Sequence, residues 1–133
     1  SIVDTKGGDV LHAMKSSDVG FFGFGESYFS TIEPNAIKGW KLHHEMVLNL
    51  VVPLGGVKFV IFDDRKGSKT EGRFSEFILS RKNYGRLTVA PNLWVAFQGV
   101  DLQDSLILNI ANIQHDPNES RTRKINELNY NWR

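Results

Sequence analysis

The sequence is a series of short apolar or alternating runs separated by turn residues, and no segment shows the 3.6-residue period of a long amphipathic helix. The runs cover residues 20–30, 37–53, 57–62, 74–79, 86–89, 93–98 and 105–113. At Gly55-Gly56 a hairpin-like turn is expected between the second and third runs. Because Val, Ile, Leu and Phe dominate these runs, they predict an all-β fold, a sandwich or small barrel, and most specifically a jelly roll.

Length and composition limit the classes of protein to which the chain can belong. With 133 residues there is room for a single domain, residues 1–133, with a real core. The absence of cysteine excludes a disulfide scaffold and a thiolate zinc site, and the formal net charge of +1 does not favour nucleic acid as a partner. No apolar run approaches the ~18 residues of a membrane span and no leader precedes the first run, so we expect a soluble, cytoplasmic protein without a membrane partner.

The C-terminal segment has a different character from the rest of the chain. Residues 117–133 are polar and charged until Tyr130 and Trp132. This pattern predicts a surface arm with an aromatic anchor at its end.

The segment 37–46, with the sequence IKGWKLHHEM, places two basic residues on one face of an otherwise apolar run. Positions of even number are mostly apolar, whereas Lys41 and His43 share the odd face, as expected for a strand. Val47 and Val51 on the same odd face indicate that this face is enclosed as well. Polar groups inside a closed sheet usually line a cavity. We therefore expect Lys41 and His43 to lie in a pocket.

A set of motifs, in this order, resembles a known family: FGESYFS, IKGWKLHHEMVLNLVVP, VKFVIFDDR, NYGRLTVAPNLWVAFQG, LILNIANIQHDP and a final YNW. Together they are similar to the cupin-type nucleotide-sugar epimerases and isomerases, in particular the short relatives of dTDP-4-dehydrorhamnose 3,5-epimerase and the dTDP-sugar 3,4-ketoisomerases. The resemblance covers nearly the whole chain. It implies a cupin-type jelly-roll barrel, a nucleotide-diphosphate 4-keto-6-deoxy sugar as substrate, no metal or redox cofactor, a homodimer, and a role in lipopolysaccharide or other surface-glycan biosynthesis.

Several positions of the family pattern carry other residues in this sequence. The Arg-Gly-x-His-x-His strand of the family is similar to residues 38–43, so Lys38 stands at the Arg position, Lys41 at the first His position and His43 at the second. Val95 fills a further His position of the family. The late strand, where the family often has a Tyr that acts as the acid, reads Leu108-Asn109-Ile110 and has no Tyr. Two or three catalytic positions are thus altered together.

Removal of a proton beside a ketone requires a base within hydrogen-bond reach, a partner for the enolate charge, and an acid. We expect His43 to be the base, because its ordinary pKa of about 6.5 leaves it mostly neutral near pH 7. Lys41 is then the cation that stabilises the enolate, or a base itself if burial lowers its pKa. Tyr28 is the candidate acid, and each of the three also has an ordinary structural interpretation.

Further residues are candidates for holding the substrate. Lys38, Arg65 and Arg73 could pair with the diphosphate, and Trp94 with Phe97 could stack on the nucleotide base. The full set of predicted substrate-binding residues is Lys38, Glu26, Asn49, Arg65, Arg73, Trp94 and Asn109. A metal site is not predicted, because Lys41, His43, Glu45 and Val95 leave too few donors at the positions that metal-binding cupins use.

Three functional hypotheses follow. The first is a cofactor-independent epimerase or ketoisomerase of a nucleotide-linked 4-keto-6-deoxy sugar. The second is a catalytically silent cupin that binds a sugar nucleotide or glycan, suggested by the altered positions. The third is an interaction subunit of a glycan-assembly complex, suggested only by apolar outer faces.

Overall fold

The computed structural model describes all residues, 1–133, as strands and loops with two short 3-10 turns. The elements are β1 (Ile2–Val3), β2 (Val10–Leu11), β3 (Glu26–Ile32), β4 (Ile37–His43), β5 (Leu48–Leu54), β6 (Gly56–Phe62), β7 (Phe74–Ser80), β8 (Arg86–Val89), β9 (Trp94–Gly99), β10 (Ser105–Ala111), η1 (Pro117–Glu119), β11 (Ser120–Thr122) and η2 (Ile125–Glu127). No helix is long and apolar enough to cross a membrane.

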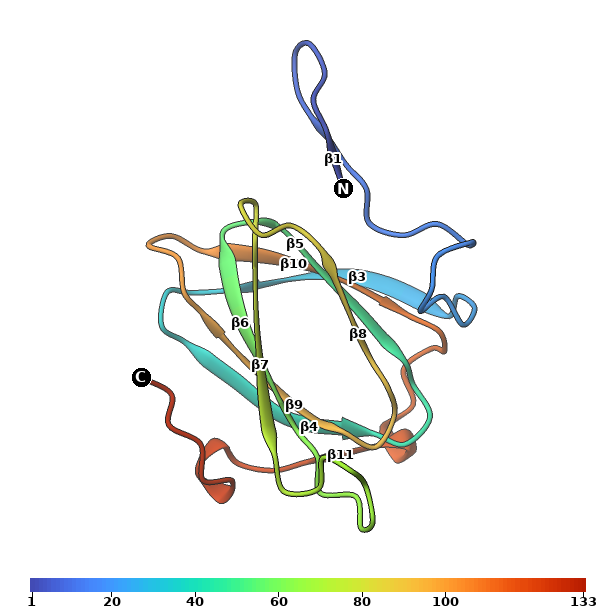
Figure 1. Cartoon of the computed structure of the whole chain (residues 1–133), viewed down its shortest axis with the longest axis vertical. Helices are drawn as coiled ribbons and strands as arrows, with labels where there is room; N and C mark the ends of the chain where they lie inside the picture. The colour runs from blue at the N-terminus through green and yellow to red at the C-terminus, as the bar shows by residue number, and fades with distance from the viewer.

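Two antiparallel sheets face one another and enclose the core (Figure 1). One sheet has the strand order β3-β10-β5-β8 and the other has the order β11-β4-β9-β6-β7. Strands that follow one another in the sequence repeatedly change sheet, as β4 to β5 and β5 to β6 do. This is the predicted jelly roll, so the all-β, cupin-type fold class is confirmed.

The predicted run 37–53 is not one strand but two, because β4 and β5 belong to different sheets. The chain crosses between the sheets at residues 44–47, and this crossing shifts the inward-facing parity. Lys41 and His43, of odd number, line the interior in β4, whereas Leu48, Leu50 and Val52, of even number, fill it in β5. The prediction that odd-numbered residues face the interior therefore holds for β4 up to His43 but not for β5.

Gly55 is a corner between sheets and not a hairpin turn, because β5 and β6 do not pair with each other. Its φ is +86°, and a Cβ there would lie 2.2 Å from the Ser105 hydroxyl oxygen. Ser105 is buried, accepts a hydrogen bond from the backbone N–H of Gly56 at 2.9 Å and donates one to the Gly56 carbonyl at 3.0 Å. Only glycine meets both the left-handed backbone and the close approach.

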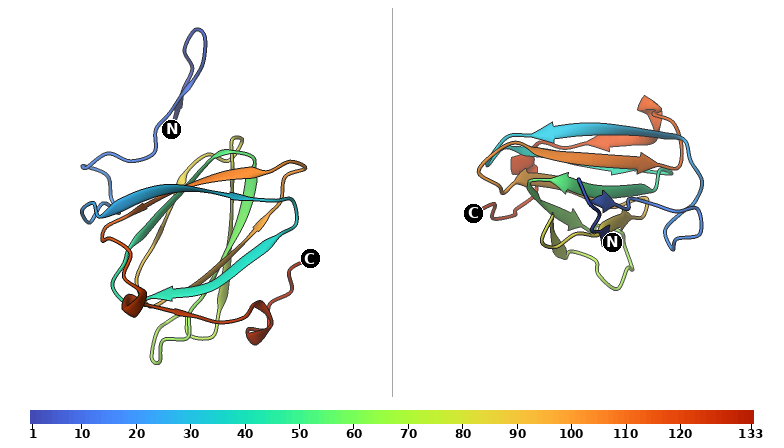
Figure 2. Two further views of the ribbon diagram at one scale, coloured as in Figure 1. Left: turned by 180° about the vertical axis from the view of Figure 1, so that it is seen from behind. Right: turned by 90° about the horizontal axis from the view of Figure 1, so that it is seen from above.

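A second apolar cluster lies on the outer face of the five-stranded sheet, where the C-terminal segment covers Trp40, Leu42, Val60 and Ala96. Figure 2 shows this segment running along the outside of β4. The Trp40 indole N–H donates to the carbonyl of Ile125 at 3.2 Å, and the ring lies 5.8 Å from that of Trp132. The predicted aromatic anchor is therefore present, and it hides the apolar face of β4 from water.

Tyr130 in the same segment packs edge-on against Trp132, with ring centroids 4.7 Å apart, and its hydroxyl donates to Glu76. Burial, followed by the contact with the Glu76 carboxylate, raises the pKa of Tyr130 to about 12. Lys58 lies beneath both rings, 5.4 Å from the Tyr130 centroid and 5.5 Å from that of Trp132. The anchor thus combines aromatic contacts with cation–π contacts.

Substitution of the anchor tests this packing. We expect Trp132→Ala to lower the free energy of unfolding by about 2–4 kcal/mol, because it removes aromatic contacts and uncovers Trp40. Denaturant unfolding followed by intrinsic fluorescence measures the change. Leu102→Ala is the control, since Leu102 is 98% exposed and its truncation should change stability by less than about 0.5 kcal/mol. Equal effects of the two substitutions would contradict the anchor role.

Candidate active site

A cavity of about 310 Å³ opens between the two sheets. Its walls come from β3, β10 and β5 on one side and from β4, β9 and β6 on the other. The polar lining residues are Tyr28, Ser30, Lys38, Lys41, His43 and Asn109, and the apolar ones are Leu48, Leu50, Phe59, Val95, Phe97 and Ile107, with Gly39. The cavity therefore carries three basic side chains against a largely apolar wall.

The alternation of β4 places Lys41 and His43 in this cavity, because Trp40 and Leu42 are buried on the other face beneath the C-terminal segment. Lys41 pairs across the sheet with Val95 of β9 and with Thr122 of β11. The cavity is thus where the two basic residues meet, as the sequence predicted. His44, the next residue, is exposed.

His43 forms a close pair with Glu119, a residue to which the sequence pattern assigned no role. Its Nδ1 lies 2.7 Å from Glu119 Oε1. The other carboxylate oxygen of Glu119, Oε2, accepts hydrogen bonds from the backbone N–H groups of Glu45 at 2.9 Å and Met46 at 2.8 Å. The pair is buried, with side-chain exposures of 11% for His43 and 4% for Glu119.

The environment of Glu119 keeps it ionised. Burial raises its pKa, but the hydrogen bond from His43 and those from the two backbone N–H groups outweigh this and hold the pKa below its ordinary value. A carboxylate only accepts hydrogen bonds, so Nδ1 of His43 must be the donor. This selects the tautomer of neutral His43 in which Nε2 has a free lone pair, and no protein group hydrogen-bonds to Nε2.

Glu119 could not be identified from the sequence because its position depends on the path of the C-terminal segment. Asp116 caps η1 by accepting a hydrogen bond from the N–H of Asn118 at 2.9 Å, and Glu119 ends this turn. Ser120 then pairs with His43 across the edge of the sheet. This pairing brings Glu119 to His43, although the two residues are 76 apart in the chain. The Asp-Pro-x-Glu motif indicates a turn, but it does not show what the Glu faces.

Asn109 and Tyr28 form a second polar pair in the cavity. The two residues are neighbours in the β10–β3 register, and Asn109 Nδ2 donates to the Tyr28 hydroxyl at 2.8 Å. Asn109 is only 5% exposed, whereas Tyr28 is 47% exposed and stands at the rim. The amide oxygen of Asn109 is buried and has no protein partner. Leaving such an acceptor unpaired costs about 1–3 kcal/mol.

Lys38 lines the same cavity, and its ammonium donates to the carbonyl of Thr31 on β3 at 2.7 Å. The following residue, Gly39, has φ +130° and lies so close to β9 that a Cβ would be 2.6 Å from that of Ala96. The β4–β9 register shifts between Gly39 and Lys41. This irregularity allows Lys38, of even number, to share the cavity with Lys41 and His43.

Five of the seven predicted substrate-binding residues lie outside the cavity, and Asn49, Trp94 and Glu26 are three of them. Asn49 is on the outer face of its sheet because of the parity shift at residues 44–47, and its amide oxygen accepts from Thr88 and Arg86. Trp94 is on the outer face of β9, where its indole N–H donates to Asp64, because neighbouring strand residues face opposite sides. Glu26 accepts a hydrogen bond from the backbone N–H of His115 at 2.9 Å and does not line the cavity.

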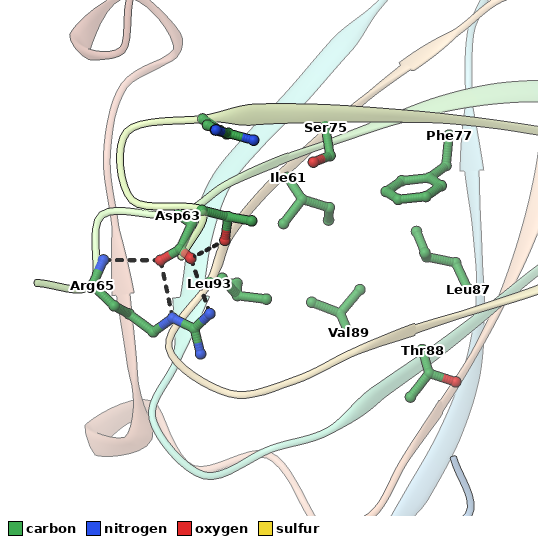
Figure 3. A pocket seen from close by; sticks show the side chains of 11 residues that line it. Ile61, Asp63, Arg65, Ser75, Phe77, Leu87, Thr88, Val89 and Leu93 are labelled. Atoms are coloured by element: carbon green, nitrogen blue, oxygen red, sulfur yellow. Dashed lines mark hydrogen bonds and ion pairs between the residues drawn. The ribbon is translucent and has the colours of Figure 1, made fainter. Parts of the chain in front are cut away.

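Arg65 and Arg73 line a different cavity, of about 210 Å³, beside β7 and β8 (Figure 3). Asp63 at its edge is buried and accepts a bidentate hydrogen bond from Arg65 as well as bonds from Ser68 and Thr70. The Arg65 guanidinium is the main reason that the pKa of Asp63 lies well below its ordinary range. Arg65 therefore stabilises its own loop, and neither arginine reaches the cavity of His43.

No group of three or more His, Asp or Glu side chains is arranged to hold a metal ion. His43 and Glu119 are a pair without a third such neighbour.

The candidate active site is formed by the polar residues of the cavity and the carboxylate that binds His43. These residues are His43, Glu119, Lys41, Lys38, Tyr28 and Asn109.

The depressed pKa of Glu119 leads to a testable pH dependence. Because the folded pKa lies below the unfolded one, the stabilisation is complete above the ordinary value of 4.5 and is lost as the pH falls through the folded pKa. We expect Glu119→Gln to lower the free energy of unfolding by about 1–3 kcal/mol at pH 7, and this deficit to shrink toward pH 3. Urea unfolding at several pH values measures it.

Glu45→Gln is the matched control, because the Glu45 side chain is exposed beside the same crossing segment. Its stability should follow that of the unsubstituted protein at every pH. A deficit in Glu119→Gln that stays constant from pH 7 to pH 3 would show that the carboxylate charge has no role in the pair.

Comparisons with known proteins agree with this architecture. A dTDP sugar isomerase from Desulfovibrio desulfuricans is 32% identical in sequence and superposes with a TM-score of 0.94, covering 99% of this chain and 86% of that protein. The dTDP-4-dehydrorhamnose 3,5-epimerase of Sulfolobus tokodaii, 22% identical, superposes with a TM-score of 0.83 over 97% of this chain and 76% of that protein, and so shares the fold.

A probable low-salt glycan biosynthesis epimerase of Haloferax volcanii is 28% identical over 99 residues, which are 71% of this chain. The match spans 64% of the length of that epimerase. No family model matches the sequence. The identity to the Desulfovibrio isomerase over nearly the whole chain nevertheless shows the relationship. The chain therefore belongs to the cupin-type family of nucleotide-sugar epimerases and isomerases.

Proposed function

We propose that this protein is a cytoplasmic epimerase or ketoisomerase that acts on a nucleotide-linked 4-keto-6-deoxy sugar in surface-glycan biosynthesis, without a cofactor. The observation that carries the proposal is the buried His43–Glu119 pair on the wall of a cavity that also contains Lys41 and Tyr28. A base oriented by a carboxylate and accompanied by a cation and a hydroxyl meets the chemical needs of proton abstraction beside a ketone.

In the first step, Nε2 of His43 takes the proton from the carbon beside the ketone, and the C–H electron pair moves to form the enolate. The Nδ1–H bond to Glu119 fixes the ring and stabilises the imidazolium that results. Glu119 thus acts through His43 as a positioning residue. It does not line the cavity and takes no proton from the substrate.

The enolate oxygen requires a positive or hydrogen-bonding partner, and the position of Lys41 in the same cavity and on the same strand as His43 supports this role for it. The Tyr28 hydroxyl accepts from Asn109, so its own proton remains available to the substrate. Return of the proton to carbon from the opposite face gives epimerisation. Protonation of the enolate oxygen instead gives an enediol. Return of the proton to the former ketone carbon, while the neighbouring hydroxyl loses its proton and becomes the ketone, gives ketoisomerisation.

Lys38 is the proposed partner of the diphosphate. Its ammonium uses one of three N–H donors on the Thr31 carbonyl, which leaves two for an anionic ligand at the cavity. Phe97 lines the same cavity and offers an aromatic wall. Arg65, Arg73 and Trp94 are not part of this proposal because they lie outside the cavity of His43.

A second candidate function is a sugar-nucleotide binding protein without catalytic activity. It is favoured by Val95, an apolar residue directly opposite Lys41 at a position where the family pattern has a histidine. Such a protein would bind the same ligands through Lys38 and Phe97 but would not exchange the proton. The two functions therefore differ in one measurable reaction.

Deuterium exchange tests the proposed chemistry. We expect the protein to introduce deuterium from heavy water beside the ketone of dTDP-4-keto-6-deoxyglucose, as observed by NMR. Removal of the base in His43→Gln and of the cation in Lys41→Met should each slow the exchange by about 10²–10⁴-fold.

His44→Gln is the control for the histidine substitution, because its exposed side chain lies next to His43 but outside the cavity. It should retain the full rate. Saturable binding with no exchange over hours, tested with several nucleotides, would favour the silent binding protein. Unchanged rates in both cavity variants would remove the two residues from the mechanism.

We also propose that the protein forms a homodimer. Strand β3 is an edge of its sheet, and Phe29 on this strand is 65% exposed. Two further phenylalanines just before the strand are also exposed, Phe24 by 65% and Phe22 by 66%. The hairpin of β1 and β2 stands clear of the sheets in Figure 1. An open strand edge beside exposed aromatic residues suits pairing with a second copy.

Sedimentation should show a mass of about twice the 15.1 kDa of the chain. Phe29→Lys should shift the equilibrium to monomer, because it places a charge in the proposed interface. Ile78→Lys is the matched control, since Ile78 is 49% exposed on β7, at an edge of the other sheet. A monomeric unsubstituted protein, or equal effects of both substitutions, would contradict this dimer.

A further inference from the structure

The three basic side chains of the cavity differ in how the protein holds them. His43 Nδ1 is bound to Glu119, and the ammonium of Lys38 donates to the carbonyl of Thr31. Lys41, by contrast, forms no hydrogen bond and no ion pair with a protein group. Its Nζ is also accessible, because it is not one of the two buried side-chain polar atoms that lack a partner. Lys41 therefore presents a free amino group to the cavity.

No carboxylate in the cavity wall is free to pair with Lys41. One oxygen of Glu119 is bound to His43, and the other accepts from two backbone N–H groups. Val95 lies directly opposite Lys41 on β9, and Lys38 and His43 are basic neighbours on either side of it along β4. Apolar and basic neighbours are the setting in which lysines act as amine nucleophiles toward carbonyl groups.

The spacing of Lys41 and His43 suits a reaction at two bonded carbon atoms. The two residues occupy successive positions on one face of β4, so their Cα atoms are about 7 Å apart. A ketone carbon and the carbon that loses its proton are joined directly. A nucleophile for the first and a base for the second must therefore come from neighbouring positions on one wall. The pair of a free amine and an oriented imidazole meets this requirement.

We propose that Lys41 forms a Schiff base with the ketone carbon of the sugar and that His43 removes the proton from the carbon beside it in this covalent intermediate. The inference rests on the proposed function. It replaces the ionic contact between Lys41 and an enolate by a bond from its nitrogen to the substrate. The missing hydrogen bonds of Lys41 agree with this role, because a cation that acts by charge alone works best when fixed contacts hold it in place.

The atoms and electrons of this route balance without a further reagent. The neutral amine of Lys41 adds to the ketone carbon, and a proton moves from nitrogen to oxygen. A proton from Tyr28 then allows the hydroxyl to leave as water, which forms the C=N⁺ bond. His43 Nε2 takes the C–H proton, the C–H pair forms a C=C bond, and the C=N pair moves to nitrogen. Reprotonation at carbon and addition of water release the ketone and the amine, and Tyr28 regains its proton.

Reductive trapping tests for the covalent bond. Sodium cyanoborohydride converts a Schiff base to a stable secondary amine, so the protein incubated with this reductant and dTDP-4-keto-6-deoxyglucose should gain the mass of one reduced sugar nucleotide. Peptide mass spectrometry should place it on Lys41, and excess dTDP should prevent it. Lys41→Arg should lower the yield by roughly 10-fold or more. Lys69→Arg is the matched control, because Lys69 is exposed in a loop outside the cavity, and it should retain the full yield.

The same substitution separates the amine from the charge. Lys41→Arg keeps a positive charge but removes the nucleophile, so deuterium exchange should fall by about 10²-fold or more, whereas a purely ionic role would preserve most of it. Because the chain has no cysteine, Lys41→Cys can be alkylated with 2-bromoethylamine at this position alone. The product is a lysine analogue with sulfur in place of one methylene, and it should recover exchange to within about 10-fold of the unsubstituted protein. Circular dichroism checks that each variant is folded.

The outcomes distinguish this inference from the function on which it rests. Deuterium exchange without an adduct on Lys41, or exchange that persists in Lys41→Arg, would overturn the covalent role and leave the proposed reaction standing. An adduct on Lys41 in a protein that never exchanges deuterium would support the covalent role and overturn the reaction. The absence of both adduct and exchange would overturn both.

Discussion

The buried pair of Glu119 and His43 holds together three parts of the molecule that are far apart in the sequence. One carboxylate oxygen binds His43 at the end of β4, and the other binds the backbone of residues 45 and 46, where the chain crosses between the sheets. Glu119 itself precedes β11, the edge strand that closes the sheet beside β4. One side chain therefore fixes the crossing, the edge strand and the orientation of the imidazole.

The two faces of β4 serve different purposes because of this arrangement. Trp40 and Leu42 lie under the C-terminal segment in a dry outer cluster, which holds the strand in place. Lys41 and His43 face the cavity between the sheets. Polar side chains with defined positions need a rigid support, and the outer cluster provides it. The aromatic anchor at Tyr130 and Trp132 is thus connected to the site without contacting it.

The cavity differs from the family pattern in a consistent way. By the resemblance of the motifs, a lysine stands at the first histidine position and a valine at a later histidine position, and the late strand, Leu108-Asn109-Ile110, has no tyrosine. The structure brings Lys41 and Val95 into direct register and pairs Asn109 with Tyr28 of the neighbouring strand. The cavity does contain a tyrosine hydroxyl, that of Tyr28 on β3. The proposed reaction accordingly assigns the acid to Tyr28 and the cation to Lys41, in the same cavity as His43.

The sequence by itself determined the all-β fold, the family, and the placement of Lys41 and His43 on one face, because these depend on local alternation and motif order. Tertiary structure decided what alternation cannot show. The crossing at residues 44–47 reverses the parity and removes Asn49 from the cavity, and the path of the C-terminal segment brings Glu119 to His43. Periodicity reports which residues share a face within one strand. It carries no information across a loop, where the chain is free to change sheets.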